Sequence, residues 1–592
     1  MHLAPQQPRL PPLTLTVHLL LLPPLPALLL SFARFASGSL YLPSTAADAF
    51  GRSASFLHWD ASTSSPVLQE ARAWVAGLSD ESGAGNALGV AYALPGLAAA
   101  HAPAGAAQAA PLLLAQLATF VQRTLLALKP DARGKAVGLT DPATRGVRAS
   151  LFWGPGMPNF TYSVQPCWDE ARASTTWRSY NYPHPVATLL AAYRITRELP
   201  GLASASAALA AASGGALDAP GAWGAYLAAA SDVHSAMGAL GGYNQFGLMV
   251  GSVYGELMDA LAQEAGAAGA EAQWATRAAA ASALQANRTA LFLVPDFPYG
   301  SEMPWDSTGQ EEIFAFTRRF AAQPGFERAL RTANLTLSAV LAYTPLCPHA
   351  LYSGSARRYF DFLVYGDPAM NRGTERALHH YGAGLNGIVL AAAAALLPNE
   401  TYYARAAFAA SWAPLLAIDA QSGAPSMGFH GDPGALRWDG YSGDWGQNMY
   451  GGAATWGCGV SALPELAGGL AGLGCDVQQQ GGSGAYTLTP YDPLRARLYL
   501  GPVGLQVTLR TGAWAQGVWD VAARTLTLGI AGAGAAPLYY DFLQLVLGAP
   551  ALEGAAAQPA QNARICAPTG ALMVRGAWVL PQSTESVVVC WD

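Results

Sequence analysis

Charged residues are scarce in this chain of 592 residues. Only 12% of the positions are Asp, Glu, Lys or Arg, and the formal net charge is −6. No segment gathers basic side chains, and this argues against a nucleic-acid partner because phosphate backbones are bound mainly by Lys and Arg. The chain is too long for one small hydrophobic core, so we expect two or more domains.

Cysteines are also few, and none is arranged as a metal ligand. There are six: Cys167, Cys347, Cys458, Cys475, Cys566 and Cys590. None forms a C-x-x-C pair, so the sequence indicates no zinc site, and no other metal or cofactor is predicted. The spacing suggests two local disulfides, Cys458–Cys475 and Cys566–Cys590, which an oxidising compartment would permit.

An uninterrupted apolar run of membrane-spanning length is missing as well. The nearest candidate is the N-terminal stretch LTLTVHLLLLPPLPALLLSFARFASGS, in which Pro23, Pro24 and Pro26 each remove a helical hydrogen bond. Arg9 before it and small residues after it are typical of a secretory signal. We therefore predict that residues 1–38 are a signal peptide cleaved at its end, with an uncleaved anchor as the alternative and no membrane contact after cleavage.

Export is the location that these features indicate together. Four N-x-S/T sequons add weak support, because such sites are glycosylated only in exported proteins; they begin at Asn159, Asn287, Asn334 and Asn399. We predict a protein that is secreted or held in the cell wall, with the endomembrane lumen as a further location.

Tryptophan and tyrosine, by contrast, are abundant, with 16 and 24 copies. Many of them stand in glycine-rich, polar stretches rather than in apolar runs. Core packing is the ordinary role of an aromatic side chain, and stacking on the C–H face of a sugar is the less common alternative.

The hydrophobic period divides the chain into two parts. From about 66 to 480, alanine-rich amphipathic stretches alternate with loops rich in Gly, Pro and aromatic residues, and this pattern predicts helical hairpins arranged around an axis. After QQQGGSGAY the period changes to two, so we expect a β-sandwich at 484–592. The predicted fold is therefore mainly α, with a C-terminal all-β domain.

The segment WDSTGQEE, residues 305–312, places three carboxylates in eight positions of a weakly charged chain. Thr308 and Glu311 fit a capping box that starts the following helix. Glu312 shares a helix face with Phe316 and Phe320. An acid beside aromatic rings has a raised pKa, which suits a general acid.

The two residues that precede this cap could bind a sugar. Asp306 stands beside Trp305 in the loop, and a carboxylate next to an aromatic ring can hold sugar hydroxyls. A turn or capping role for Asp306 is an equal alternative.

Three further loops carry polar and aromatic side chains. RSYNYPHPVATLL presents Asn181, Tyr182 and His184 at a proline-stiffened helix start, with a packed aromatic turn as the alternative. In YGDPAMNRGTERALHHYGAGLNG, Glu375 and His379 share a helix face, with an exposed ion pair as the alternative.

The last loop, RWDGYSGDWGQNMYGG, is the richest in aromatic residues. It surrounds Asp439 and Asp444 with Tyr441, Trp445 and other rings among several glycines. A purely structural loop rarely contains two aspartates and four aromatics, so we favour a functional role.

In this order, the motifs SYNYPH, MPWDSTGQEE, YGDPAMNRGTERALHHYGAGLN and DGYSGDWGQNMYG resemble an uncharacterised domain family grouped with the six-hairpin glycosidases. The resemblance covers about 139–592. It implies an (α/α)6 toroid at 139–480, an accessory β-domain, and a role in carbohydrate chemistry. Residues 39–138 would form a separate helical region, where that family has a larger β-rich one.

The leading functional prediction is a secreted glycoside hydrolase with a poly- or oligosaccharide as its partner. Such enzymes use two carboxyl groups. Glu312 is the predicted acid and Asp444 the base or nucleophile, with three carboxylates in reserve: Asp306, Asp439 and Glu375. The predicted sugar-binding side chains are those of His184, Tyr182, Asn181, Trp305, Tyr441 and Trp445, together with Asp439 and Glu375.

Two alternatives stay open. One is a polysaccharide lyase, because RSYNYPH contains the Tyr, His, Asn and Arg that proton abstraction and uronate neutralisation need, with Tyr182 and His184 moving the proton. The other is a non-catalytic sugar-binding protein of the cell wall. The sequence does not indicate the oligomeric state.

Overall fold

A computed structural model gives the structure of the protein. It describes residues 25–43, 54–60, 64–66, 84–99, 102–128, 138–149, 170–214, 217–267, 271–298, 300, 307–342, 344, 377–397, 400–426, 428–430, 445–455, 457–463, 469–482, 484–494, 497–509, 512–531, 542–548, 563–568, 572–574, 577–581, 584 and 586–591.

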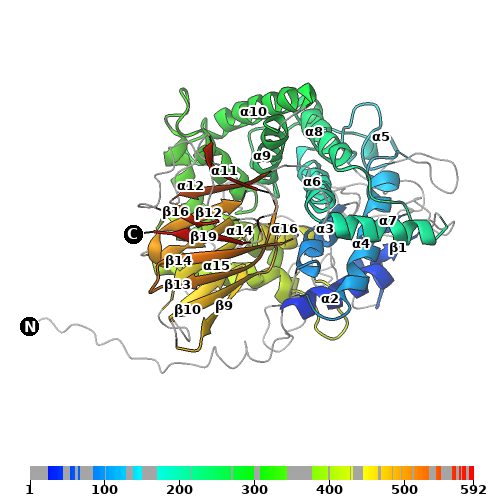
Figure 1. Cartoon of the computed structure of the whole chain (residues 1–592). Coiled ribbons are helices and arrows are strands. Elements are labelled where there is room, and N and C mark those ends of the chain that lie inside the picture. The colour runs from blue at the N-terminus through cyan, green and yellow to red at the C-terminus, as the bar shows by residue number, and fades with distance from the viewer. Residues whose placement is uncertain are drawn as a thin grey trace, which may run out of the picture.

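Within these residues, the centre of the molecule is a closed ring of helices, each of which contacts the next. In order around the ring they are α3 (Gly85–Leu97), α6 (Pro183–Glu198), α9 (Val253–Ala265), α11 (Gln310–Phe320), α14 (His380–Leu396) and α16 (Trp445–Thr455). The contact of α16 with α3 closes the ring. Figure 1 shows these helices beside the β-domain.

A second layer of helices packs outside this ring. It consists of α2 (Leu25–Phe35), α4 (Ala106–Phe120), α8 (Trp223–Leu240), α10 (Ala272–Phe292), α12 (Ala329–Ala342) and α15 (Thr401–Leu416). Each contacts a helix of the inner ring, and α7 (Pro200–Ala212) packs on α4 and α6. The helical toroid predicted from the sequence is therefore confirmed. It includes α2, α3 and α4, which come from residues before 139.

Small residues allow the inner helices to approach one another closely. Every residue of α3 and of α16 is buried, including the few polar side chains that these helices contain. A Cβ atom at Gly446 would overlap the carbonyl oxygen of Gly85, and one at Gly451 would overlap the backbone of Gly384. Glycine at these positions is what permits contact between the helices.

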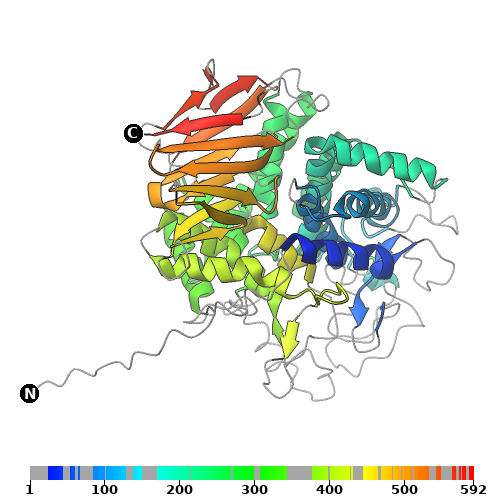
Figure 2. The same ribbon diagram turned by 60° about the horizontal axis from the view of Figure 1, so that its bottom comes forward.

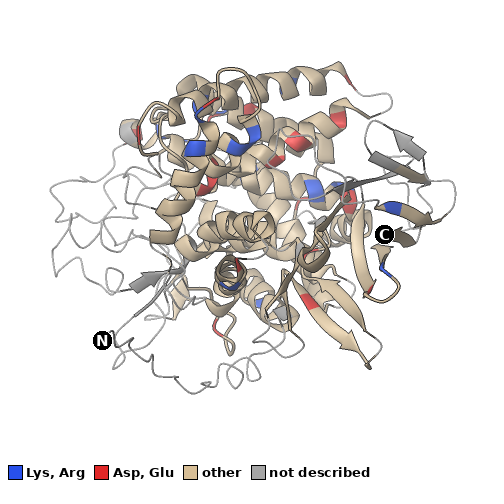
Figure 3. Cartoon of the chain, turned by 90° about the vertical axis from the view of Figure 1, so that its left-hand side faces the viewer, with Lys and Arg blue, Asp and Glu red and all other residues tan. Residues whose placement is uncertain are grey.

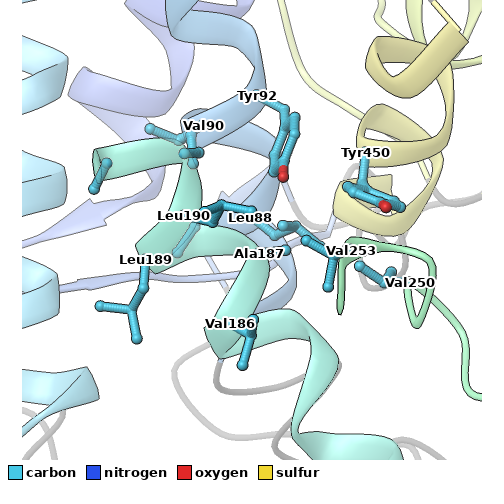
Figure 4. Packing of buried hydrophobic residues seen from close by; sticks show 14 of the residues in the cluster. Leu88, Val90, Tyr92, Val186, Ala187, Leu189, Leu190, Val250, Val253 and Tyr450 are labelled. Carbon is cyan, nitrogen blue, oxygen red and sulfur yellow. The ribbon is translucent and has the colours of Figure 1, made fainter. Parts of the chain in front are cut away.

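The hydrophobic core lies between the inner helices. Val186, Leu189 and Leu190 on α6 are buried, and their i, i+3, i+4 spacing places them on one face. The ring of Tyr92 on α3 meets that of Tyr450 on α16 edge-on, with centroids 5.1 Å apart. Figure 4 shows these residues side by side in the same cluster.

Helix α2 belongs to this core, although its sequence was predicted to be part of a signal peptide. Leu29 and Phe32 are fully buried, and the Phe32 ring lies 4.3 Å from that of Trp445. Figure 2 shows α2, in dark blue, lying across the other helices. Cleavage after Gly38 would remove α2 from the mature protein, whereas the structure packs α2 in the hydrophobic core. The predicted cleavage and this packing therefore imply different mature N-termini.

The C-terminal part of the chain forms two sheets. One has the strand order β16 (Arg564–Ala567), β19 (Ser586–Cys590), β14 (Thr525–Ala531), β13 (Ala513–Asp520), β10 (Ala485–Pro490), β9 (Cys475–Gln480). The other has the order β17 (Leu572–Val574), β18 (Ala577–Pro581), β15 (Phe542–Gly548), β12 (Leu505–Leu509), β11 (Arg497–Leu500), β7 (Cys458–Ala462), β8 (Leu470–Leu473). Neighbours are antiparallel except for β11 and β7.

Both sheets contribute to one hydrophobic cluster, with Leu488 and Trp514 from one and Val460 and Val507 from the other. The predicted all-β domain after the helices is therefore confirmed as a sandwich. Its strands begin at Cys458, earlier than the period change in the sequence. Short apolar runs such as CGVSA and LAGL do not by themselves distinguish a strand from a buried helix.

Three two-stranded sheets accompany these elements. Strand β1 (Tyr41–Leu42) pairs with β2 (Ser55–Phe56), β3 (Trp59–Asp60) with β4 (Ser65–Pro66), and β5 (Ala377–His379) with β6 (Gly428–His430). The last pair joins a segment inside the third sequence motif to one that precedes the fourth. Because His379 ends a strand and α14 begins only at His380, the predicted helix face shared by Glu375 and His379 is wrong.

The predicted disulfide Cys566–Cys590 is confirmed, with Cα atoms 6.0 Å apart. Cys475 is also disulfide-bonded, while the side chain of Cys458 lies outside the described residues. No helix in the described ranges combines the length and the apolar character needed to cross a membrane.

Candidate functional site

Hydrogen bonds join four inner helices around the start of α11. Just before α9, the backbone N–H of Leu248 donates a hydrogen bond to Glu312 in the first turn of α11. The Asn386 amide on α14 donates to the Ser307 hydroxyl before α11, at 3.1 Å. Ser252 and Tyr450 share a hydrogen bond of 2.8 Å between α9 and α16.

Glu312 is fully buried and forms an ion pair with Arg288 of α10, which is 1% exposed. The Nη2 atom of Arg288 lies 2.8 Å from Oε1 and 2.7 Å from Oε2 of the carboxylate. Burial raises the pKa of Glu312, and the guanidinium and the N–H of Leu248 partly offset this rise. The ion pair with the buried Arg288 guanidinium favours the anionic form of Glu312.

Glu311, the preceding residue, has a different environment. Its carboxyl is buried, and neither oxygen has a hydrogen-bond partner at normal geometry. Burial first, and the negative charge of Glu312 second, raise the pKa of Glu311 to about 8, although backbone N–H groups including that of Ser252 lower it. Glu311 is therefore protonated at neutral pH.

The predicted capping box is wrong. The N-cap of α11 is Gly309, whose φ of +81° lies in the left-handed region, and no side chain caps the helix. Glycine reaches this conformation without the strain that other residues meet. Because the helix begins one residue later than predicted, Glu311 does not close a box with Thr308 and its carboxyl lies among core atoms instead.

Several predicted site residues cannot be placed, because they lie outside the described residues. They are Trp305, Asp306, Glu375, Asp439, Tyr441 and Asp444. Trp445 is described. It opens α16, is fully buried, and donates a hydrogen bond from Nε1 to the carbonyl of Pro414, so its ring packs in the core.

The second motif lies at the start of α6 and is also buried. The Asn181 amide donates to the carbonyl of Arg148 at 3.0 Å, and the Tyr182 hydroxyl donates to that of Thr176 at 2.6 Å. Burial raises the pKa of Tyr182 to about 12. His184, in the first turn of α6, is fully buried as well.

Sequence reasoning missed Arg288, the residue on which the geometry of Glu312 depends. Figure 3 shows that only scattered positions along the described ribbon are Lys, Arg, Asp or Glu. An arginine within the alanine-rich stretch of α10 was the available signal, because a charge on a face that packs inward needs a partner.

A cavity of about 350 Å³ lies between the toroid and the β-domain. Helices α9, α11, α14 and α16 line it together with strands β7, β8, β11 and β12. Ser252 and Tyr450 are among its lining residues, whereas the described residues of the predicted site are not. No group of three or more His, Cys, Asp or Glu side chains suited to a metal ion occurs in the part of the chain that the structure describes.

No curated protein matches the chain. Among solved structures, it is similar to a chain described as a polysaccharide lyase, with a TM-score of 0.46 and 13% identity. The similarity covers 72% of this chain and 51% of the lyase, so the chain spans about half of the length of that protein. The sequence pattern of a family of unknown function, DUF5695, matches residues 12–587, and the chain belongs to that family.

Proposed function

We propose that the protein is a secreted, carbohydrate-active enzyme that hydrolyses glycosidic bonds, with Glu311 as the general acid. One observation carries the proposal: Glu311 is a fully buried carboxyl without a hydrogen bond at normal geometry, next to a second carboxylate that an arginine fixes as an anion. Adjacent acids whose environments push their pKa values apart are typical of acid–base catalysis.

The energetics support a functional role for Glu311. Burying a polar group without a hydrogen bond costs about 1–3 kcal/mol. The Glu312 anion adds to this cost by disfavouring ionisation of its neighbour. A residue that destabilises the fold and yet occupies the first turn of an inner helix suggests a site where function takes precedence over stability.

The roles of the two glutamates then differ from the sequence-based assignment. Glu311 carries the proton that the leaving glycosidic oxygen needs. Glu312, paired with Arg288, acts as a positioning residue that keeps the pKa of Glu311 high. The second catalytic carboxylate is proposed to be Asp444 or Asp306, with Asp439 and Glu375 in reserve.

Glu311 is only 1% exposed. A substrate can reach its carboxyl only if residues around the start of α11 shift when the substrate binds. The proposal therefore includes an opening step before catalysis, of the kind that often limits the rate of an enzyme.

Carbohydrate is the proposed substrate class for two reasons. The four ordered motifs resemble those of the six-hairpin glycosidases, and the fold is a helical toroid followed by a β-sandwich. The disulfide Cys566–Cys590 fits folding in an oxidising compartment, which is where we propose that the enzyme acts.

A glycan-panel screen of the wild-type protein with two matched variants tests the proposal. Glu311→Gln should fold with an unchanged or higher Tm and lose roughly 10²-fold or more in turnover, because an amide cannot donate the proton. Glu312→Gln leaves Arg288 buried without its anion and should cost about 3–5 kcal/mol of stability.

The outcomes separate the three candidate functions. Near-normal turnover by Glu311→Gln would exclude it as the acid. A product with the ultraviolet absorbance of an unsaturated uronate would instead establish a lyase, for which Tyr182 and His184 are the candidate residues. Binding without turnover by the wild-type protein would establish a non-catalytic role.

A further inference from the structure

Two exposed aromatic rings lie side by side near the first turn of α6. Trp177 is 48% exposed and Tyr243 is 38% exposed, and their ring centroids are 5.4 Å apart. They come from loops more than 60 positions apart in the sequence, so the fold itself brings them together. Tyr180 and Phe246 lie behind Tyr243, with centroids at 5.8 and 5.9 Å.

The backbone holds this pair in place. The N–H of Gly242 donates a hydrogen bond of 2.6 Å to the carbonyl of Trp177, and the Ser179 hydroxyl donates to the carbonyl of Gly242. Tyr243 itself has a φ of +61°, a conformation that is uncommon and costly for a bulky side chain. Strained backbone positions of this kind cluster at active sites and ligand clamps.

The same loop is tied to the carboxyl pair through Arg288. Its Nη1 atom donates to the backbone carbonyl and to the side-chain oxygen of Asn244, each at 3.3 Å, and its Nη2 atom donates to the carbonyl of Phe246 at 3.3 Å. Nη2 also holds Glu312. One buried guanidinium therefore fixes both the loop that carries Tyr243 and the anion beside Glu311.

We propose that Trp177 and Tyr243 form a stacking subsite for a sugar ring of the substrate. The inference rests on the proposed function, because it places this subsite next to the catalytic carboxyls. A pyranose presents an apolar C–H face that packs on an aromatic ring, and its hydroxyls point sideways to water and to polar neighbours. Arg178, whose guanidinium lies 5.4 Å from the centre of the Tyr180 ring, is such a neighbour.

The size of the pair favours a sugar over a protein partner. An aromatic side chain buries at most about 150–250 Å², so two rings offer less than roughly 500 Å². A stable protein interface needs about 1,000 Å² or more. Two adjacent rings are instead of the right extent for one or two sugar units.

The test measures binding separately from turnover. Trp177→Ala, Trp177→Tyr and a control, Tyr402→Ala on the outer helix α15, are each made in the Glu311→Gln protein so that the substrate survives. Affinity electrophoresis in gels containing xylan, mixed-linkage β-glucan or polygalacturonate gives the dissociation constants, and thermal melts check the fold.

We expect the Glu311→Gln parent to be retarded by at least one of these polysaccharides. Trp177→Ala should weaken that binding about tenfold, which corresponds to about 1.4 kcal/mol, with an unchanged Tm. Trp177→Tyr should recover most of the affinity, and Tyr402→Ala should bind like the parent.

Equal retardation of the Trp177→Ala and parent proteins would overturn the subsite, and so would retardation of the parent by none of the polysaccharides. A loss of binding that the Trp177→Tyr variant does not recover would also overturn it. If Glu311 is not the general acid but the subsite is real, the result differs. Glu311→Gln would then keep its turnover, while Trp177→Ala would still lose binding.

Discussion

Helix α2 provides the most direct test of the N-terminal prediction. If residues 1–38 were a cleaved signal, the mature protein would fold without Leu28, Leu29 and Phe32, which are at most 2% exposed in this structure. Burying each such side chain contributes about 1.5–3 kcal/mol, so the three together contribute roughly 5–9 kcal/mol. This is comparable to the whole free energy of unfolding of a typical domain, about 5–15 kcal/mol.

We therefore expect a protein that begins at Ser39 to be unfolded or to melt far below one that begins at Leu25. The single substitution Phe32→Ala in the longer protein should cost about 3–5 kcal/mol, because it leaves a hole against Trp445. Arg34→Ala, at an exposed position on the same helix, is the matched control and should change stability by less than about 0.5 kcal/mol.

Thermal melts and urea titrations of the four proteins provide the measurement, and mass spectrometry of protein exported from its native cells identifies the mature N-terminus. Equal Tm values for the proteins that begin at Ser39 and Leu25 would refute the inference that α2 is structural. A mature chain that starts after Gly38 would restore the signal peptide.

Three other predictions follow from the buried charges and the disulfide. The pKa of Glu311 is raised to about 8 in the folded state, whereas the unfolded state releases this proton above its ordinary pKa near 4.5. The free energy of unfolding should therefore fall between about pH 5 and pH 8, by up to about 1.4 kcal/mol per pH unit. Glu311→Gln should flatten this slope in urea titrations. The double variant Arg288→Met, Glu312→Met should be more stable than Glu312→Gln alone, because it leaves no buried unpaired charge; equal stability in thermal melts would contradict the ion pair. Replacing Cys566 and Cys590 with Ser opens a loop with a sequence separation of 24, and should lower the unfolding free energy by about 3 kcal/mol, measured by urea titration without reductant.

The fold was largely predictable because its determinants are local. A helical period over alanine-rich segments and a period of two after Gly481 are enough to indicate helices followed by strands. Closure of the ring was not predictable, because it depends on contacts such as that of Gly446 with Gly85, far apart in sequence. The packing of α2 was not predictable because an apolar stretch near the N-terminus matches both a signal and a buried helix.

The candidate site was predictable only as a location. Residues 307–312 of the segment WDSTGQEE lead into and open the inner helix α11, but the environments of its two glutamates could not be assigned from sequence. The pairing of Glu312 with Arg288 joins α11 to α10, and no local pattern encodes it. Trp177 and Tyr243 were missed for the same reason, because exposure and proximity are tertiary properties.

The order of the two glutamates has a geometric cause. Successive residues of an α-helix point about 100° apart, so Glu311 and Glu312 at the start of α11 cannot share one environment although they are neighbours. Glu312 points toward α10, where Arg288 neutralises it, while Glu311 lies near the backbone N–H of Ser252 before α9. The Ser252 hydroxyl in turn bonds to Tyr450. One helical step thus separates an ionised carboxylate from a protonated carboxyl, and the positions of both depend on where α11 starts. The left-handed Gly309 fixes that start.

Gly309→Ala should therefore disturb the pKa of Glu311 as well as the stability of α11. A pH–stability slope unchanged in this variant would show that the pKa of Glu311 does not depend on the start of α11.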